Sequence, residues 1–174
     1  MLSRVRMTIL LFALSPIAAN AVPMIDVEKF TNGLNADIAG DGPQIAEGDV
    51  VAWTYQVTNT GDSALDTILL FDDNGTLGFL GDDFNPTFTG VDVGGDGILS
   101  PNEIWGYEHF SFAVAGQYTN IATVTGVISG SDTTVMDSDP SNYFGLGGVV
   151  PEPSTLALMT LGLAGIGYSR RKKM

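Results

Sequence analysis

The chain has 174 residues, a length that suits one domain with additional segments, and its formal net charge is −13. The stretch from Val22 to Glu152 holds all twenty acidic side chains but a single basic one, Lys29, which gives it a net charge of −19. So negative a stretch repels nucleic acid, which is excluded as a partner. The absence of cysteine also excludes disulfides, thiolate metal sites and a cysteine nucleophile.

The first 21 residues have the three parts of a secretory signal peptide. Arg4 and Arg6 supply a positive start, residues 7–14 are an apolar run, and Ala19 and Ala21 present small side chains at the positions that signal peptidase reads. A retained anchor is the alternative, but so short an apolar run cannot cross about 30 Å of hydrocarbon. We therefore expect export, with cleavage after Ala21.

Residues 22–144 have the pattern of short strands separated by turns. The clearest strands are expected at 49–60 and 103–113, where side chains of opposite character alternate. In the first, Val51, Trp53, Tyr55 and Val57 share a face; in the second, Trp105, Tyr107 and His109 lie opposite Ile104, Phe110 and Phe112. Further strands are expected at 25–30, 65–71, 84–90, 117–128 and 133–136. Strands at this spacing predict an all-β fold, an antiparallel β-sandwich.

Four segments of this region resemble a known domain. They read VEKFTNGLNAD, GDVVAWTYQVTNTGDSAL, DVGGDGILSPNEIWGYE and GQYTNIATVTG, and they lie between Val27 and Val127. Together they resemble the Ig-like repeat domain of bacterial surface and adhesin proteins. The resemblance implies an Ig-like sandwich that serves as a stalk or binding module and has no catalytic activity. Those proteins often carry many copies, whereas this sequence contains one.

The twelve residues from Asp92 to Glu103 follow the spacing of an EF-hand calcium loop. Calcium prefers oxygen ligands, and Gly97 allows the sharp turn that such a loop needs. Position 3 is Gly94, which offers no side-chain oxygen, and no helices flank the loop. The alternatives are therefore a weak Ca²⁺ site and an acidic turn that binds nothing. The candidate ligands are Asp92, Asp96, the carbonyl of Ile98, Ser100 and Glu103.

Other acidic residues occur in pairs, and each pair is expected in a solvated turn rather than in a metal site. These pairs are Asp37 and Asp41, Asp72 and Asp73, Asp82 and Asp83, and Asp137 and Asp139.

Enzymatic activity is not expected. The exported region has one histidine, His109, and one lysine, and no serine stands in a G-x-S-x-G turn. A glycosidase with two carboxylates would normally need a long groove, for which one small sandwich offers little room.

The last 30 residues are arranged as a sorting segment. Residues 145–150 are expected to be a flexible spacer. Pro151, Glu152 and Pro153 follow, then an apolar transmembrane helix at 155–169 and a basic tail of Arg170, Arg171, Lys172 and Lys173. The helix reaches only about 22 Å at about 1.5 Å per residue, and the tail is expected to stay on the cytoplasmic side. A plain stop-transfer anchor is the alternative.

The order of these parts over residues 151–174 closely resembles the PEP-CTERM sorting signal. The resemblance implies that a membrane-embedded protease, exosortase, cuts near Pro151–Pro153. It also implies a precursor anchored in the inner membrane of a Gram-negative bacterium and a final place at the cell surface or in the extracellular matrix.

Two classes of function are compatible with this organisation. The first is a structural or adhesive role in exopolysaccharide or biofilm, with other surface proteins as partners. The second is a carbohydrate-binding module that retains exopolysaccharide on exposed aromatic rings such as Trp105, Tyr107 or Tyr143.

Overall fold

The computed structural model describes Val22 and residues 24–148. The expected signal peptide with Ala19 and Ala21, the 151–153 motif, the 155–169 helix and the 170–173 tail lie outside the described residues. Within the described part, no helix is long and apolar enough to cross a membrane. Nine strands are present in it: β1 (Ile25–Thr31), β2 (Leu34–Asn35), β3 (Gln44–Ala46), β4 (Val50–Asn59), β5 (Leu65–Asp72), β6 (Thr87–Phe88), β7 (Ile104–Phe112), β8 (Gly116–Ile128) and β9 (Thr134–Leu146).

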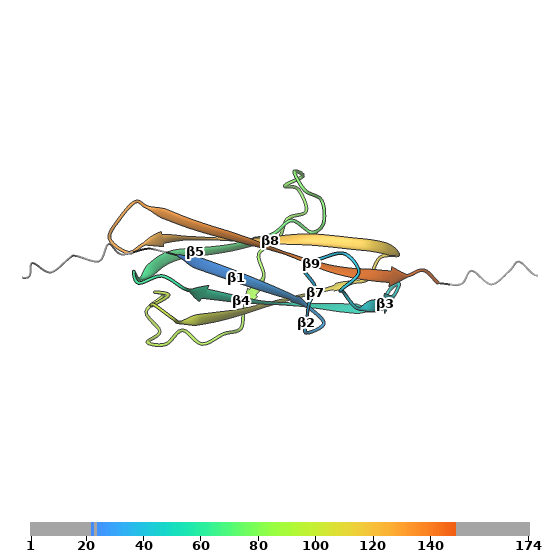
Figure 1. The fold of residues 1–174 in the computed structure, drawn as a ribbon, viewed down its shortest axis with the longest axis horizontal. Coiled ribbons are helices and arrows are strands. Elements are labelled where there is room, and N and C mark those ends of the chain that lie inside the picture. Colours follow the sequence, from blue (N-terminus) through green and yellow to red (C-terminus); the bar gives the residue numbers. More distant parts are fainter. Residues whose placement is uncertain (1–21, 23, 149–174) are drawn as a thin grey trace, which may run out of the picture.

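The strands form two sheets that lie face to face, and the strands run along the long axis of the molecule (Figure 1). One sheet has the order β2-β1-β4-β7-β6 and the other the order β3-β9-β8-β5. The all-β sandwich is therefore as predicted. Its second sheet is mixed rather than purely antiparallel, because the chain crosses from β2 to the edge of that sheet. There β3 lies parallel to the end of β9.

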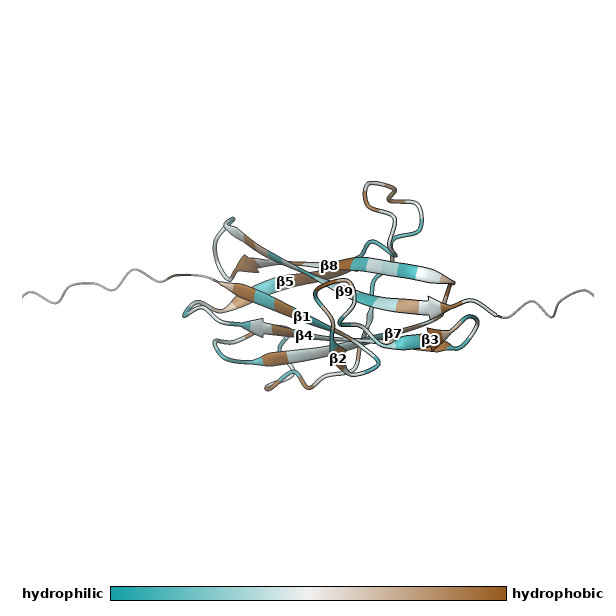
Figure 2. Ribbon diagram, turned by 45° about the vertical axis from the view of Figure 1, so that its right-hand side comes forward, coloured by the Kyte–Doolittle hydropathy of each residue, from teal (hydrophilic) through white to brown (hydrophobic). Residues whose placement is uncertain are grey.

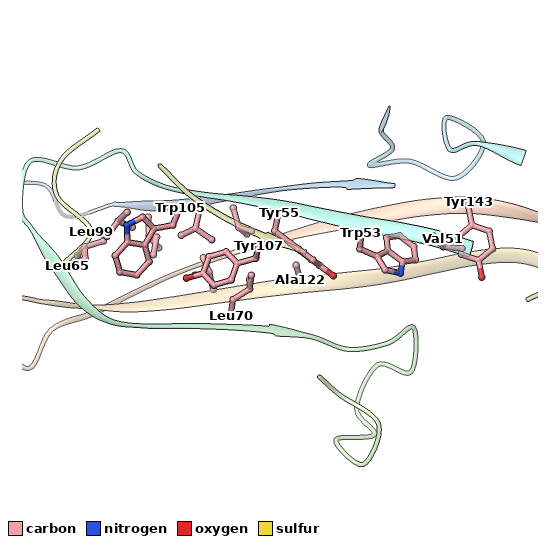
Figure 3. Close-up of a cluster of buried hydrophobic side chains, with 14 of the residues drawn as sticks. Val51, Trp53, Tyr55, Leu65, Leu70, Leu99, Trp105, Tyr107, Ala122 and Tyr143 are labelled. Atoms are coloured by element: carbon pink, nitrogen blue, oxygen red, sulfur yellow. The ribbon is translucent and has the colours of Figure 1, made fainter. Parts of the chain in front are cut away.

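The core lies between the sheets and is rich in aromatic rings (Figure 3). Alternation along each strand places it there, because successive side chains point to opposite faces. Val51, Trp53, Tyr55 and Val57 of β4 are all buried, as expected. On β7, Phe110 and Phe112 face solvent, on the opposite side of the strand from the buried rings.

Strand β9 is much longer than the expected strand at 133–136. It pairs with β8 from Thr134 to Gly145. Residues 137–142 have the composition of a turn, but in the structure alternate side chains bond to β1. Asp137 accepts the N–H of Val27 at 2.9 Å, Asp139 accepts the N–H of Lys29 at 2.7 Å, and Thr31 and Ser141 share a hydrogen bond. The polar side chains of β9 thus cover the edge of β1.

The beginning of the expected spacer at 145–150 belongs to the sheet. Gly145 is paired with both Gly116 and Ile45, and Leu146 with Ala46. A Cβ atom on Gly145 would run into the backbone carbonyl of Val114. This glycine therefore permits a close approach of two backbones, which a sequence pattern does not distinguish from flexibility.

The connection from β5 to β6 includes a loop that projects from the sandwich (Figures 1 and 2). The strand expected at 84–90 is reduced to the two residues of β6. Before it, Phe84 forms an isolated bridge with Asp72. The loop exposes three large apolar side chains, those of Leu77, Phe79 and Leu80.

Candidate functional site

Glu103 is the centre of the acidic loop that the sequence proposes for calcium. Its side chain is buried, and each carboxylate oxygen accepts hydrogen bonds. Oε1 accepts the N–H of Val93 at 2.6 Å and the indole N–H of Trp105 at 3.1 Å, and Oε2 accepts the N–H of Ser100 at 2.8 Å. Burial by itself would raise the pKa of Glu103, but these donors outweigh it and hold the pKa below its usual value.

The other acidic residues of the loop also bind its own backbone. Asp92 Oδ2 accepts the N–H of Gly97 at 2.8 Å, and Asp96 Oδ1 accepts the N–H of Ile98 at 3.0 Å. Asp92, Asp96 and Glu103 are not among the carboxylates that gather closely enough to hold an ion in the described residues. Asp92 Oδ1, in contrast, is buried and accepts no hydrogen bond within the described residues. Hydrogen bonds to its own backbone therefore hold the loop in shape, and calcium binding by Asp92, Asp96 and Glu103 stays a prediction.

The aromatic residues suggested for sugar binding do not form an exposed row. Trp105, Tyr107 and Tyr143 are all buried in the core. Phe88 packs edge-on against the rings of Trp105 and Tyr107, and Tyr143 stacks on Tyr118. The predicted platform is therefore wrong for these three residues. Alternation placed Trp105 and Tyr107 on one face of their strand, but it does not say which face is covered, and Tyr143 lay outside the expected strands.

The most unusual chemistry of the described residues lies in the core, where sequence analysis proposed no site. Lys29 of β1 and Asp72 of β5 are both completely buried, and Lys29 Nζ lies 2.6 Å from Asp72 Oδ2. Asp72 was expected in a solvated turn and is instead the last residue of its strand, pointing inward. The pair connects the two sheets, because β1 and β5 belong to different ones.

Asp72 collects further hydrogen bonds from both layers. The hydroxyl of Tyr55, which lies opposite Lys29 on β4, donates to Asp72 Oδ2 at 2.7 Å. Asn120 of β8 donates from Nδ2 to Asp72 Oδ1 at 2.8 Å, and the N–H of Asn74 reaches the same oxygen at 3.1 Å. Asn120 is completely buried, and its Oδ1 accepts no hydrogen bond within the described residues.

Burial shifts the pKa values of the titratable side chains around Asp72. It lowers the pKa of Lys29 to about 8, although the Asp72 carboxylate favours the ammonium form. Burial and the same carboxylate raise the pKa of Tyr55, so its hydroxyl stays a donor. Lys29 Nζ also lies over two rings, 4.7 Å from the centre of Trp53 and 5.6 Å from that of Tyr55. His109 lies nearby: its ring stacks on Phe84, and burial lowers its pKa.

A second acidic group lies at the edge where β1 meets β9. The carboxylate oxygens of Glu28, Asp37 and Asp139 lie within 4.8 Å of one another. Burial, together with repulsion by Asp37 and Glu28, raises the pKa of Asp139 to about 6, although the N–H of Lys29 opposes the shift. Burial and Asp37 also raise the pKa of Glu28, whose Oε1 accepts a hydrogen bond from Asn35. The cluster is therefore a place of like-charge repulsion at neutral pH.

One feature of the sequence could have indicated that Lys29 is buried in the core. Lys29 is the only lysine or arginine between Val22 and Glu152, and it lies in a predicted strand between the apolar Val27 and the polar Thr31. Alternation from Ile25 and Val27 places it on the inner face. Nothing in the sequence indicated that Asp72 and Asn120 would meet it.

Comparison with known proteins assigns the segment that follows the sandwich. Residues 149–172 match the family described as PEP-CTERM protein-sorting motif, and this range includes Pro151, Glu152 and Pro153. The match marks the chain as an exported protein that exosortase processes at the membrane on its way to the cell surface. No curated protein matches the chain.

Among solved structures, one match is AggA, the major subunit of aggregative adherence fimbriae type I from Escherichia coli. It is 9% identical, the alignment covers 76% of this chain and 98% of that chain, and the TM-score is 0.37. A likeness this weak is not evidence of a shared function.

Proposed function

We propose that this chain is a non-enzymatic structural or adhesive component of the surface or matrix of a Gram-negative bacterium. The observation that carries the proposal is the position of the sandwich relative to the sorting motif. Strand β9 ends at Leu146 and the matched motif begins at residue 149. The sorting motif therefore follows a β-sandwich directly, so that sorting delivers this sandwich to the surface.

We further propose that the sandwich is Ig-like. If β1, β4, β5, β6, β7, β8 and β9 are named A to G, the two sheets have the orders A-B-E-D and G-F-C. These are the strand orders of the constant-type immunoglobulin domain. β2 and β3 are short additions at the edges. This topology supports the resemblance seen in the sequence and suits a module that presents loops at its surface.

The projecting loop between β5 and β6 is the candidate contact surface. Leu77 and Leu80 are more than four-fifths exposed, and Phe79 is nearly two-thirds exposed. Neighbouring large apolar side chains that face solvent are typical of surfaces that contact other molecules. Other surface proteins and exopolysaccharide are the proposed partners in a biofilm. The carbohydrate-binding alternative lacks the three rings on which it was based.

The sorting part of the proposal is tested by replacing Pro151, Glu152 and Pro153 with alanine. We expect the full-length precursor to accumulate in the inner membrane, because the segment that exosortase recognises is gone. A matched control replaces Gly147 and Gly148 with serine, outside the matched motif, and should be processed normally. Normal processing of the triple-alanine variant would contradict sorting through this motif.

The adhesive part is tested separately with Leu77, Phe79 and Leu80 replaced by serine. This variant should reach the surface in normal amounts, because the three side chains are exposed and do not hold the core together. We expect cells that carry it to adhere as weakly as cells without the protein. Adherence equal to that of cells with the parent protein would reject this loop as the contact surface.

A further inference from the structure

We propose that Lys29 and Asn120 become joined by an intramolecular isopeptide bond, which the folded domain forms by itself. The bond would link Nζ of Lys29 on β1 to Cγ of Asn120 on β8, with Asp72 as the group that moves the protons. This proposal concerns a covalent modification of the core and does not depend on the surface role proposed above.

The first argument is the position of the lysine. In a domain with a net charge of −18 from Val22 to Gly148, a basic side chain at the surface would relieve repulsion between the carboxylates. Its only lysine is instead completely buried beneath two aromatic rings. Removing an ammonium and a carboxylate from water generally costs more than their attraction returns. An amide bond removes the charge of Lys29 and so ends that penalty for the amine.

The second argument is the arrangement around Asp72. Its two oxygens contact the two groups that would react: Oδ2 lies 2.6 Å from the Lys29 amine and Oδ1 lies 2.8 Å from the Asn120 amide nitrogen. One carboxylate can therefore take a proton from the nucleophile and give a proton to the leaving group. Groups held in this way react as if at very high concentration. The buried, unpartnered Oδ1 of Asn120 would become the carbonyl oxygen of the new bond.

The protonation of Lys29 favours the reaction. Only a neutral amine has a lone pair with which to attack, and burial lowers the pKa of Lys29 to about 8. About one amine in ten is thus neutral at pH 7, whereas for an exposed lysine the fraction is below about one in a thousand.

The step balances without any cofactor or oxidant. Asp72 takes a proton from the Lys29 ammonium, and the freed lone pair of Nζ attacks Cγ of Asn120, forming the N–C bond while the carbonyl π electrons move to Oδ1. When the carbonyl forms again, the Cγ–Nδ2 bond breaks and its electron pair stays on Nδ2. Asp72 passes protons from Nζ to Nδ2, which leaves as ammonium. The net change converts a lysine ammonium and an asparagine amide into a secondary amide and an ammonium ion, with Asp72 unchanged.

Asn120 is the better acceptor than Asp72, although Asp72 is also close to the amine. An ionised carboxylate is a poor electrophile, and Asp72 already accepts hydrogen bonds from Tyr55, Asn74 and Asn120. The product would tie the first strand of one sheet to β8 of the other. Separation of the two sheets would then require breaking a covalent bond.

The experiment uses the full chain, purified and then denatured before digestion with trypsin. Lys29 is the only trypsin site between Arg6 and Arg170, and a lysine in an isopeptide bond is not cleaved. We expect no cleavage after residue 29. Digestion after glutamate should yield a linked pair of fragments, one from Lys29 to Glu47 and one that begins at His109, one ammonia lighter than their sum.

Two variants serve as controls. Lys29→Arg keeps a positive charge and a trypsin site but has no amine that can form the bond, so it should be cut after residue 29. Asp72→Asn keeps both reacting residues and removes the carboxylate that moves protons, so it should be cut and have its full mass. Trypsin cleavage after Lys29 in the parent protein, with circular dichroism showing that it was folded beforehand, would overturn the proposal. A link from Lys29 to Asp72, which would lack one water instead of one ammonia, would also overturn it.

Discussion

Nζ of Lys29 lies 2.6 Å from Oδ2 of Asp72, and neither side chain is exposed to solvent. The pair joins β1 to β5 across the core and places opposite charges among Trp53, Tyr55 and Asn120. Such a pair contributes little net stability, but each charge becomes very unfavourable when its partner is removed.

The first prediction concerns this pair. Relative to a domain with a free Lys29 ammonium, Lys29→Met should be destabilised by about 3–5 kcal/mol, because it leaves the Asp72 carboxylate buried without a counter-charge. Loss of the proposed isopeptide bond would add to this difference. Combining Lys29→Met with Asp72→Asn removes that charge and keeps an acceptor for Tyr55. The double variant should therefore be more stable than Lys29→Met, as measured by urea unfolding. Equal midpoints for the two variants would mean that the unpaired charge is not the cause of the loss.

The second prediction distinguishes a structural Glu103 from a calcium ligand. Glu103→Gln should lower stability by about 1–3 kcal/mol, because three donors lose a charged acceptor. The loss should be the same in chelator and in millimolar calcium. It should grow smaller as the pH falls, because the depressed pKa of Glu103 makes its contribution present at neutral pH and lost at low pH.

The matched control is Asp96→Asn, which changes an exposed residue of the same loop and should have little effect. Melting curves in chelator and in calcium decide between the two interpretations. A calcium-dependent rise in melting temperature that both substitutions abolish would identify the loop as a calcium site.

Three segments, β4, β9 and the loop from Asp92 to Glu103, show which features of the structure could be predicted from the sequence and which could not. The inner face of β4 was predictable because four apolar side chains alternate with polar ones, and the pleat converts that period directly into burial. Strand β9 was underestimated because its polar residues satisfy donors of β1, a partner more than a hundred positions away. Local composition carries no information about such a partner. The match between Asp92–Glu103 and a calcium loop stays a prediction, since a carboxylate at a ligand position can accept backbone N–H groups as well as bind a cation.

The third prediction concerns the pH dependence of stability at Asp139. The pKa of this group is raised from 3.8 to about 6 in the folded protein, so the folded state holds more protons than the unfolded state between these values. Its contribution to stability is therefore present at low pH and is lost as the pH rises through that window. Asp139→Asn should raise stability at pH 7 by ~1 kcal/mol, a value reduced for partial exposure.

The amide that this substitution introduces would still offer an oxygen to the N–H of Lys29. Thermal unfolding at pH 4 and pH 7 measures the effect, and the variant and the parent should converge at the lower pH. Asp26→Asn, on an exposed residue of β1, is the control. A variant that is less stable than its parent at pH 7 would show that the carboxylate contributes more through its hydrogen bond than it loses by repulsion.

The last prediction tests whether the sandwich continues to residue 146. Gly145→Ala should destabilise the domain by about 3 kcal/mol, because the added Cβ would collide with the carbonyl of Val114 and a backbone group cannot rotate away. Gly147→Ala is the matched control two residues further on, where the Cβ would only touch the side chain of Ala115 at 3.7 Å. The unfolding midpoint of Gly145→Ala should therefore lie well below that of Gly147→Ala. If residue 145 belonged to a flexible spacer, both substitutions would be neutral, and the sorting motif would be separated from the domain by a free linker.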